Sequence, residues 1–173
     1  MGLIYRRIPQ SLALSLKDKY RLKVFVETGT FMGKTCEWAA NYFPLVLTVE
    51  LFEDYYKATS QRLKNISNIR FFHGDSGTIL GKVLKLATSP ALIWLDAHWS
   101  RDLAYTVPDG LCPVLRELDW IILDKRSHVI LVDDAGLFVG KNGFPKKELI
   151  VSSMMRSARK VCEVTDVLVS EPR

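Results

Sequence analysis

VFVETGTFMGKT, residues 24–35, runs from an apolar strand that ends on a carboxylate, through two glycines, into a helix. Gly29 permits a tight turn, and Gly33 lets a ligand approach the start of the helix. Glu27 places a fixed negative charge at the carboxyl end of the strand, and the phosphate-loop spacing GxxxxGK(S/T) is absent. The stretch therefore favours a cationic or neutral adenosyl ligand over a bare phosphate, although turn glycines alone would give the same pattern.

The rest of the chain alternates apolar runs with helical patterns. We expect strands at 22–27, 45–50, 69–72, 91–96 and 129–132, and helices at 11–20, 34–42, 53–64, 77–87, 108–123 and 146–160. This order predicts right-handed βαβ units, hence an α/β, Rossmann-like, doubly wound sheet of seven mostly parallel strands in a three-layer αβα fold. Residues 161–169 predict a C-terminal antiparallel hairpin that turns at Thr165-Asp166. We expect a single domain over 1–173, with 1–21 as a helical lead-in.

Composition indicates an ordinary globular protein, with 48% hydrophobic and 25% charged residues in 173. No apolar run approaches the roughly 18 residues that span a bilayer, and no signal-peptide pattern is present, so we expect a cytoplasmic protein. The net charge of +5 is scattered, which favours a solvated face over nucleic-acid binding. Neither a disulfide framework nor a zinc site is indicated by the three widely spaced cysteines, Cys36, Cys112 and Cys162.

Carboxylates follow the predicted strands. They are Glu27, Glu50, Asp75, Asp96, Asp133 and Asp134. Ligands of such sheets bind beyond the carboxyl ends of the strands, so these side chains should share one edge. Carboxylates at this density repel one another, which implies a ligand with hydroxyl groups, an amine or a metal. For Asp75 alone, capping of the following helix is the favoured role, with Ser76 as the alternative cap.

At this point the chain resembles the class I S-adenosylmethionine-dependent methyltransferases over nearly its whole length, with residues 27–33 in place of their glycine-rich first motif. The resemblance implies S-adenosylmethionine as the cofactor. It implies a cofactor site made of Glu27, Thr28, Gly29, Thr30, Gly33, Thr35, Glu50, Asp75, Ser76 and Asp96. Glu27 and Gly29 would lie against the methionine part, and Asp75 with Ser76 would meet the adenine edge. Glu50 would accept the two ribose hydroxyls, a task that suits a charged acceptor.

A narrower resemblance, to the macrocin O-methyltransferase group, rests on WLDAHWS at 94–100, CPVLREL at 112–118 and VILVDD at 129–134. That group methylates sugar hydroxyls with magnesium. The resemblance implies that a divalent metal is held by Asp96, Asp133 and Asp134, and Mg²⁺ prefers such oxygen ligands. His98 then stands where a general base is needed, and the pKa of imidazole suits this role. A polar loop residue is the alternative for His98.

The sequence thus predicts an S-adenosylmethionine-dependent O-methyltransferase that acts on the hydroxyl of a small molecule such as a sugar, assisted by Mg²⁺. A metal lowers the pKa of a bound hydroxyl while a base removes its proton. Only about 20 residues precede the first strand, fewer than in the macrocin group, which favours a small or exposed acceptor. A homodimer is compatible with the resemblance.

Three alternatives remain open at this point. A metal-dependent hydrolase is disfavoured by Glu50 and by the absence of a GxSxG motif. A noncatalytic binding protein could share the fold, because fold does not fix function. A nucleic-acid methyltransferase would suit the basic charge, but the chain lacks an Asn-Pro-Pro-aromatic motif, an Asp-Pro-Pro-aromatic motif and a Pro-Cys pair.

Overall fold

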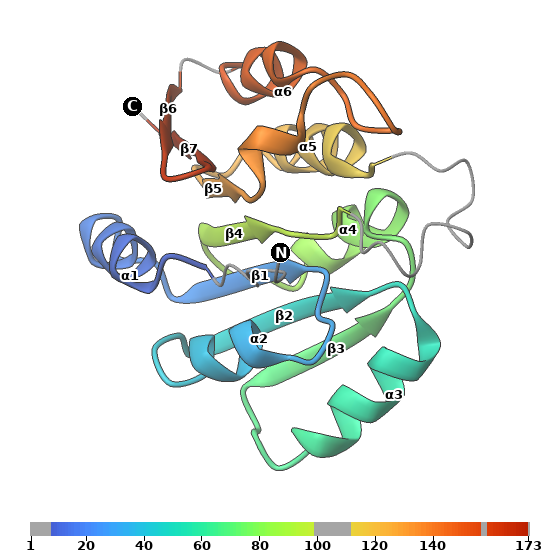
Figure 1. The fold of residues 1–173 in the computed structure, drawn as a ribbon. Coiled ribbons are helices and arrows are strands. Elements are labelled where there is room, and N and C mark those ends of the chain that lie inside the picture. The colour runs from blue at the N-terminus through green and yellow to red at the C-terminus, as the bar shows by residue number, and fades with distance from the viewer. Residues whose placement is uncertain (1–7, 99–111, 157–158, 173) are drawn as a thin grey trace.

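A computed structural model describes residues 8–98, 112–156 and 159–172 of the chain. Its strands form one sheet in the order β3-β2-β1-β4-β5-β7-β6 (Figure 1). The strands are β1 Val24–Thr28, β2 Leu45–Glu50, β3 Ile69–His73, β4 Ala91–Leu95, β5 Val129–Val132, β6 Lys160–Val164 and β7 Val167–Glu171. The first five are parallel, and β7 runs antiparallel to both β5 and β6. The predicted sheet, with its antiparallel C-terminal hairpin, is confirmed.

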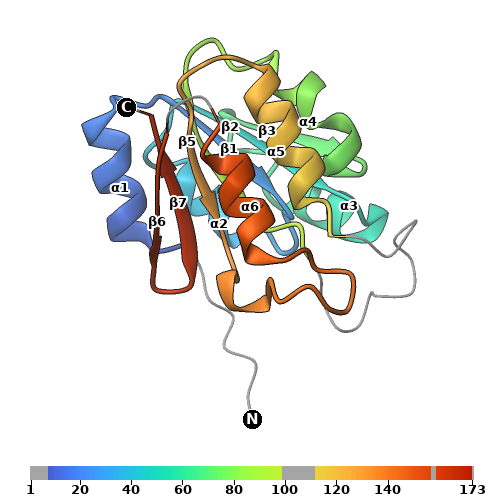
Figure 2. The same cartoon turned by 90° about the horizontal axis from the view of Figure 1, so that it is seen from above.

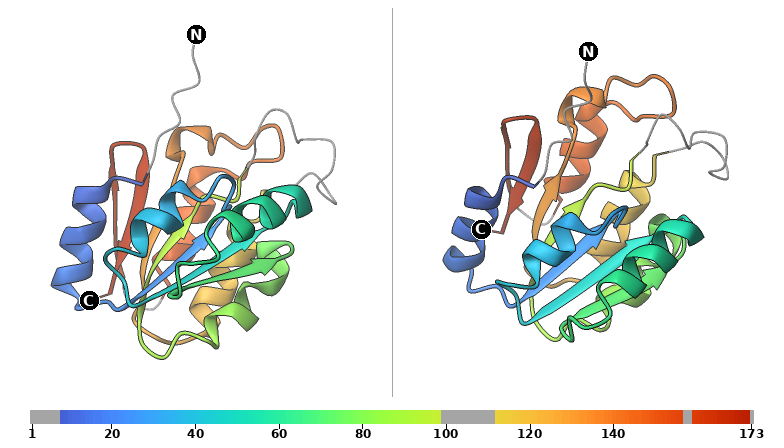
Figure 3. Two further views of the ribbon diagram at one scale, coloured as in Figure 1. Left: turned by 90° about the horizontal axis from the view of Figure 1, so that it is seen from below. Right: turned by 60° about the horizontal axis from the view of Figure 1, so that its bottom comes forward.

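Helices cover both faces of this sheet. They are α1 Gln10–Lys19, α2 Lys34–Ala39, α3 Glu53–Arg62, α4 Ser76–Leu84, α5 Val114–Leu123 and α6 Lys147–Met154, with a short 3-10 helix, η2, at Ala135–Leu137. Figures 2 and 3 show α1, α2 and α3 on one side of the sheet and α4, α5 and α6 on the other. None of the described helices is both long and apolar enough to cross a membrane.

The core consists of two apolar clusters, one on each face of the sheet. Successive strand residues point to opposite faces, so Phe25 and Trp94 pack with α1 and α2, while Val26 and Ile93 pack with α4, α5 and α6. All four side chains are fully buried. Burial on both faces explains why the parallel strands are apolar throughout.

Several helices are shorter than the sequence predicts. The expected helix 146–160 ends at Met154, because residues from Lys160 onward pair with β7 as an edge strand. Thr165 and Asp166 have φ of 48° and 68°, as the two central residues of a tight hairpin turn require. The expected start of a helix at 108–111 lies outside the described residues.

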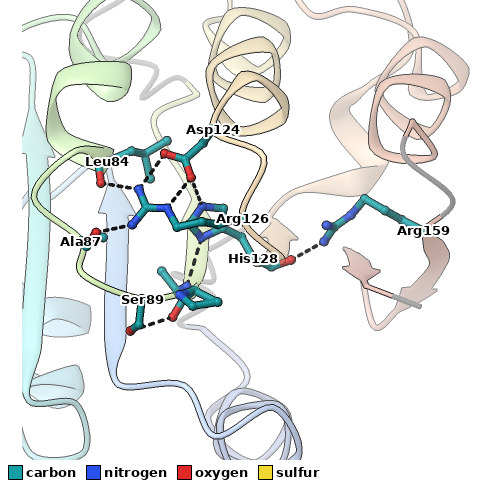
Figure 4. Close-up of polar contacts among 9 residues, drawn as sticks. Leu84, Ala87, Ser89, Asp124, Arg126, His128 and Arg159 are labelled. Carbon is teal, nitrogen blue, oxygen red and sulfur yellow. Dashed lines mark hydrogen bonds and ion pairs between the residues drawn. The ribbon is translucent and has the colours of Figure 1, made fainter.

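A polar network closes the edge of the sheet at the amino ends of β4 and β5 (Figure 4). The guanidinium of Arg126 grips both carboxylate oxygens of Asp124, at 2.5 and 2.6 Å. It also donates to the carbonyl oxygens of Leu84, at 2.7 Å, and of Ala87, which lie at the end of α4 and just beyond it. Burial opposes ionisation of Asp124, but hydrogen bonds from Arg126 and His128 lower its pKa to about 2.

His128 links this network to the two strands. Its Nε2 donates to Asp124 at 3.0 Å, and its Nδ1 accepts the backbone N–H of Ala91 at 3.0 Å. Arg159, which is itself buried, donates to the carbonyl oxygen of His128. Burial lowers the pKa of His128, so the neutral ring is the stable form. His128 therefore has a structural role at the edge remote from the strands' carboxyl ends.

Replacing Arg126 with alanine is expected to destabilise the fold by about 2–4 kcal/mol, because it removes the guanidinium that donates to Asp124 and to the carbonyl oxygens of Leu84 and Ala87. Urea unfolding monitored by circular dichroism measures the change. The control is Arg156→Ala, which removes an exposed ion pair with Asp119 and should cost much less. Equal losses in the two variants would show that the network adds no more than a surface pair.

Candidate active site

The residues that the sequence predicts for the site lie along the edge at which the five parallel strands end. Glu27 and Thr28 are the last residues of β1, and Glu50 is the last residue of β2. Asp75 follows β3, Asp96 follows β4, and Asp133-Asp134 follow β5. The expectation that these carboxylates share one edge is therefore met.

The turn between β1 and α2 is held very close to the end of β4. Gly29 has φ of 83°, and a Cβ added to it would lie 2.4 Å from the carbonyl oxygen of Asp96. Only glycine fits this approach of two backbones. Gly33 has φ of 71°, but the space beside it is filled by Thr59 of α3, whose Cγ2 would lie 2.4 Å from an added Cβ. Gly33 thus permits close packing of the start of α2 against α3, and the ligand approach at Gly33 stays a prediction of the sequence.

Glu50, at the end of β2, holds the same turn through a hydrogen bond. Its Oε2 accepts the backbone N–H of Phe31 at 2.7 Å, and its Oε1 accepts that of Phe52 at 2.8 Å. Each carboxylate oxygen has a second lone-pair direction, so the group can still accept hydroxyl donors. Glu50 is therefore oriented by two backbone N–H groups and retains the capacity to hold a vicinal diol.

Glu27 is almost completely buried on the α2 side of the sheet. Thr48 donates to its Oε2 at 2.6 Å, and the hydroxyl of Thr48 also lies 2.6 Å from that of Thr30. Burial raises the pKa of Glu27 to about 8, with Thr48 opposing and the charge of Glu50 adding to the rise. The sequence suggested a fixed negative charge at Glu27. With this pKa the carboxyl is instead mostly protonated near pH 7. A cation beside it would favour the ionised form.

The raised pKa of Glu27 predicts a loss of stability as pH rises from acidic to weakly alkaline values. The folded-state pKa of about 8 exceeds the unfolded value of 4.5, so the protonated carboxyl favours folding; this contribution is complete below pH 4.5, shrinks as pH rises and is lost once pH has passed 8. We expect the thermal midpoint to fall between about pH 5 and 8 and to level off above, and to fall less in Glu27→Gln, whose neutral amide can still accept from Thr48. Scanning calorimetry measures both profiles. Parallel profiles would contradict the assignment.

Asp75 caps α4, as the sequence predicts. Its Oδ1 accepts the backbone N–H of Gly77 at 3.0 Å, while its Oδ2 accepts from the hydroxyl of Thr78 at 2.9 Å and from Arg116 of α5 at 3.0 Å. Both oxygens therefore have protein donors. Ser76, the first residue of α4, is nearly buried beside this cap.

A set of possible metal ligands gathers where β4 and β5 end. One ligand atom each from Asp96, His98 and Asp134 lies within 4.8 Å of the other two. The sequence predicted Asp133 in place of His98, but Oδ1 of Asp133 accepts the backbone N–H of Asp134 at 2.8 Å. Burial raises the pKa of Asp96 well above its usual range, and the charges of Asp133 and Glu27 add to the rise. A divalent cation would fit this donor set and relieve the repulsion.

His98 presents an unused lone pair to this cluster. Its Nε2 lies 3.0 Å from the carbonyl oxygen of Asp133, which can only accept, so Nε2 carries the proton. Its Nδ1 is buried and has no hydrogen-bond partner among the described residues. Burial lowers the pKa of His98 to about 4, against the effect of the Asp133 carbonyl. The ring is thus neutral at pH 7, and this lowered pKa makes Nδ1 a weaker base than that of a free imidazole. Trp99 and Ser100 of the same motif lie outside the described residues.

Sequence reasoning missed two residues of this region, Thr48 and Glu117. Thr48 of β2 is paired in register with Glu27 of β1. A hydroxyl residue inside an otherwise apolar strand is the sequence signal that could have identified Thr48 as part of the site. Glu117 is fully buried on α5, on the same face as Val114, Leu118 and Ile121. A glutamate within the apolar stripe of a helix is unusual, and this spacing could have identified it.

The comparisons with known proteins were made by sequence and by structure. No protein-family model and no curated protein matches the sequence. Among solved structures, a putative O-methyltransferase from Klebsiella pneumoniae superposes with a TM-score of 0.66 at 16% identity, over 100% of this chain and 84% of that one. The O-methyltransferase TomG from Streptomyces achromogenes, solved with SAM, gives 0.64 at 17% identity, over 98% and 82%. An O-methyltransferase from Bacillus cereus, solved with SAH, gives 0.64 at 14% identity, over 97% and 83%.

These likenesses extend over almost the whole chain, and they show that it shares the fold of these O-methyltransferase structures. At this level of identity they carry the fold and no more. None of the three structures is described as a macrocin O-methyltransferase, so that narrower resemblance stays a prediction.

Proposed function

We propose that the protein is an S-adenosylmethionine-dependent O-methyltransferase that acts on the hydroxyl of a small molecule with the help of a divalent metal. One observation carries the proposal. Glu50, whose carboxylate is held by two backbone N–H groups, and the convergent atoms of Asp96, His98 and Asp134 lie at the same edge of the sheet. The similar proteins from Streptomyces achromogenes and Bacillus cereus are described as O-methyltransferases and were solved with SAM and SAH.

The cofactor is assigned to the loops that follow β1, β2, β3 and β4. Glu50 would accept the ribose hydroxyls, because a carboxylate forms strong hydrogen bonds with a vicinal diol. The methionine part would lie near Glu27 and Gly29, where a sulfonium stabilises the ionised carboxylate. The adenine edge would lie at Asp75 and Ser76. The remaining residues assigned to the site are Thr28, Thr30, Gly33, Thr35 and Asp96.

The acceptor would bind on the side of Asp96 and Asp134, which we assign as ligands of a divalent metal, with Asp133 as a further predicted ligand. A bound divalent metal supplies a Lewis acid that lowers the pKa of the acceptor hydroxyl. Nδ1 of His98 would take the hydroxyl proton as the oxygen attacks the sulfonium methyl, forming an O–CH3 bond as the S–CH3 bond breaks. A sugar as the acceptor, Mg²⁺ as the metal, a homodimer and action in the cytoplasm remain predictions of the sequence.

Methyl transfer from radiolabelled S-adenosylmethionine to a panel of sugars and other hydroxyl compounds tests the proposal, with Mg²⁺ and with EDTA in parallel. We expect transfer to a hydroxyl that EDTA abolishes. His98→Gln should reduce the rate by about 100-fold, the usual contribution of a general base. Transfer only to nitrogen, carbon or nucleic acid would contradict the proposal, as would a rate that EDTA leaves unchanged.

A further inference from the structure

Glu117 stands out as a buried carboxyl group that the proposed site does not yet use. It has no exposed surface, and neither of its carboxylate oxygens has a hydrogen-bond partner among the described residues. The hydroxyl of Thr28, at the end of β1, is also buried and without a partner. Unsatisfied buried polar groups are costly and uncommon, so a site for hydrogen-bond donors is indicated here.

Close packing of α5 on α4 fixes Glu117 at the cofactor edge. Trp120 of α5 donates from Nε1 to the carbonyl oxygen of Gly77 at 2.9 Å. A Cβ added to Gly77 would lie 2.8 Å from Cζ of Arg116, so the backbone of α4 at Gly77 packs directly against the Arg116 side chain of α5. The hydroxyls of Ser76 and Thr28 are near enough to the Glu117 carboxyl to lower its pKa, although burial dominates and raises it to about 7. Neither hydroxyl forms a hydrogen bond with the Glu117 carboxyl among the described residues.

Asp75, the carboxylate expected at the adenine edge, is already engaged. Its oxygens accept from Gly77, Thr78 and Arg116, and Arg116 is the residue directly before Glu117. An amino group of a ligand at this edge would find one acceptor position left on Asp75, on Oδ1, because protein donors occupy the other three. Glu117 is the nearby carboxylate without donors, and it shares Ser76 with the predicted adenine site.

We propose that Glu117 is a specificity-determining residue that accepts a hydrogen bond from the 6-amino group of the cofactor's adenine. This inference rests on the proposed function. Because the carboxyl has no solvent contact, binding requires a shift of the Ser76 or Glu117 side chain. A carboxylate accepts from the amino group of adenine but repels the carbonyl oxygen that replaces it in hypoxanthine. The protein should therefore discriminate between adenine and its deaminated form.

The test is calorimetric titration of the full chain with S-adenosylhomocysteine and with S-inosylhomocysteine, at pH 8.5, where the Glu117 carboxyl is ionised. The wild type should prefer the adenosyl compound by about 10-fold or more, the value of one hydrogen bond to a charged group. In Glu117→Gln, whose amide donates to a carbonyl, the preference should fall to within about 3-fold. The exposed control Glu148→Gln should keep the wild-type ratio.

A wild type that binds both compounds equally would overturn the inference without any variant, and so would a wild-type ratio retained in Glu117→Gln. If that variant does not fold, Glu117→Asp serves in its place, since it keeps the charge but withdraws the carboxyl by one methylene. The preference should fall there too, and an unchanged ratio would overturn the inference. A wild type that binds neither compound would instead remove the proposed function itself.

Discussion

Replacement of Glu50 with alanine is expected to weaken the binding of S-adenosylhomocysteine by about 100-fold or more. Two hydrogen bonds from the ribose to a charged acceptor would be lost, together about 3 kcal/mol, which corresponds to that factor. The backbone N–H groups of Phe31 and Phe52 would also lose their acceptor, so the turn that follows β1 would become less ordered. Calorimetric titration of the two proteins measures the change.

Two further variants show whether the affinity is lost because the ribose diol loses its acceptor or because the turn after β1 becomes less ordered. Glu50→Gln retains one acceptor oxygen and the size of the side chain, so we expect an intermediate loss of about 10-fold. Glu53→Ala removes an exposed glutamate from the first turn of α3, where it pairs with Lys57, and should leave binding unchanged. Wild-type affinity in Glu50→Ala would refute the assignment of the ribose site.

Replacement of Asp134 with asparagine is expected to reduce divalent-metal affinity, and with it the rate of methyl transfer, by about 100-fold or more. Asp134 has φ of 53°, a left-handed conformation that asparagine tolerates better than most residues, so the fold should persist. The substitution removes the negative charge of one of the three side chains whose ligand atoms converge, the other two being Asp96 and His98. Electron paramagnetic resonance of Mn²⁺ titrated into the protein measures metal binding directly, without knowledge of the acceptor.

The same variant should bind S-adenosylhomocysteine within about 3-fold of the wild type, because Asp134 follows β5 and the cofactor is assigned to the loops after β1 to β4. Asp54→Asn, on the exposed side of α3, controls for the loss of one negative charge. Metal affinity equal to that of the wild type in Asp134→Asn would contradict the metal site. A parallel loss of cofactor affinity would show that Asp134 itself contributes to the cofactor site.

The sequence predicted which strand ends form the site, because strands are identified from the local pattern of apolar residues. Apolar runs that end on Glu27, Glu50 and Asp96 identify parallel strands, and the direction of those strands places their carboxyl ends at one edge. Asp75 could be predicted as a helix cap for the same reason, since capping depends on residues only two or three positions away.

Features that depend on contacts distant in sequence could not be predicted in the same way. The role of Gly33 is set by Thr59, 26 residues later, which fills the space beside it. The charge state of Glu27 is set by burial and by Thr48 on the neighbouring strand. His98 joins Asp96 and Asp134 only because the loop after β4 turns its ring toward the end of β5. The types and spacing of residues along the chain do not show which distant residues come into contact in the fold.

The central claim is that the edge formed by Glu27, Glu50 and Asp96 binds an adenosyl cofactor beside a divalent metal. Calorimetric titration of S-adenosylhomocysteine into the purified protein, with and without Mg²⁺, tests it most directly. We predict micromolar binding in both conditions, with a binding enthalpy that Mg²⁺ changes because the metal and the cofactor share Asp96. No detectable binding in either condition would contradict the claim.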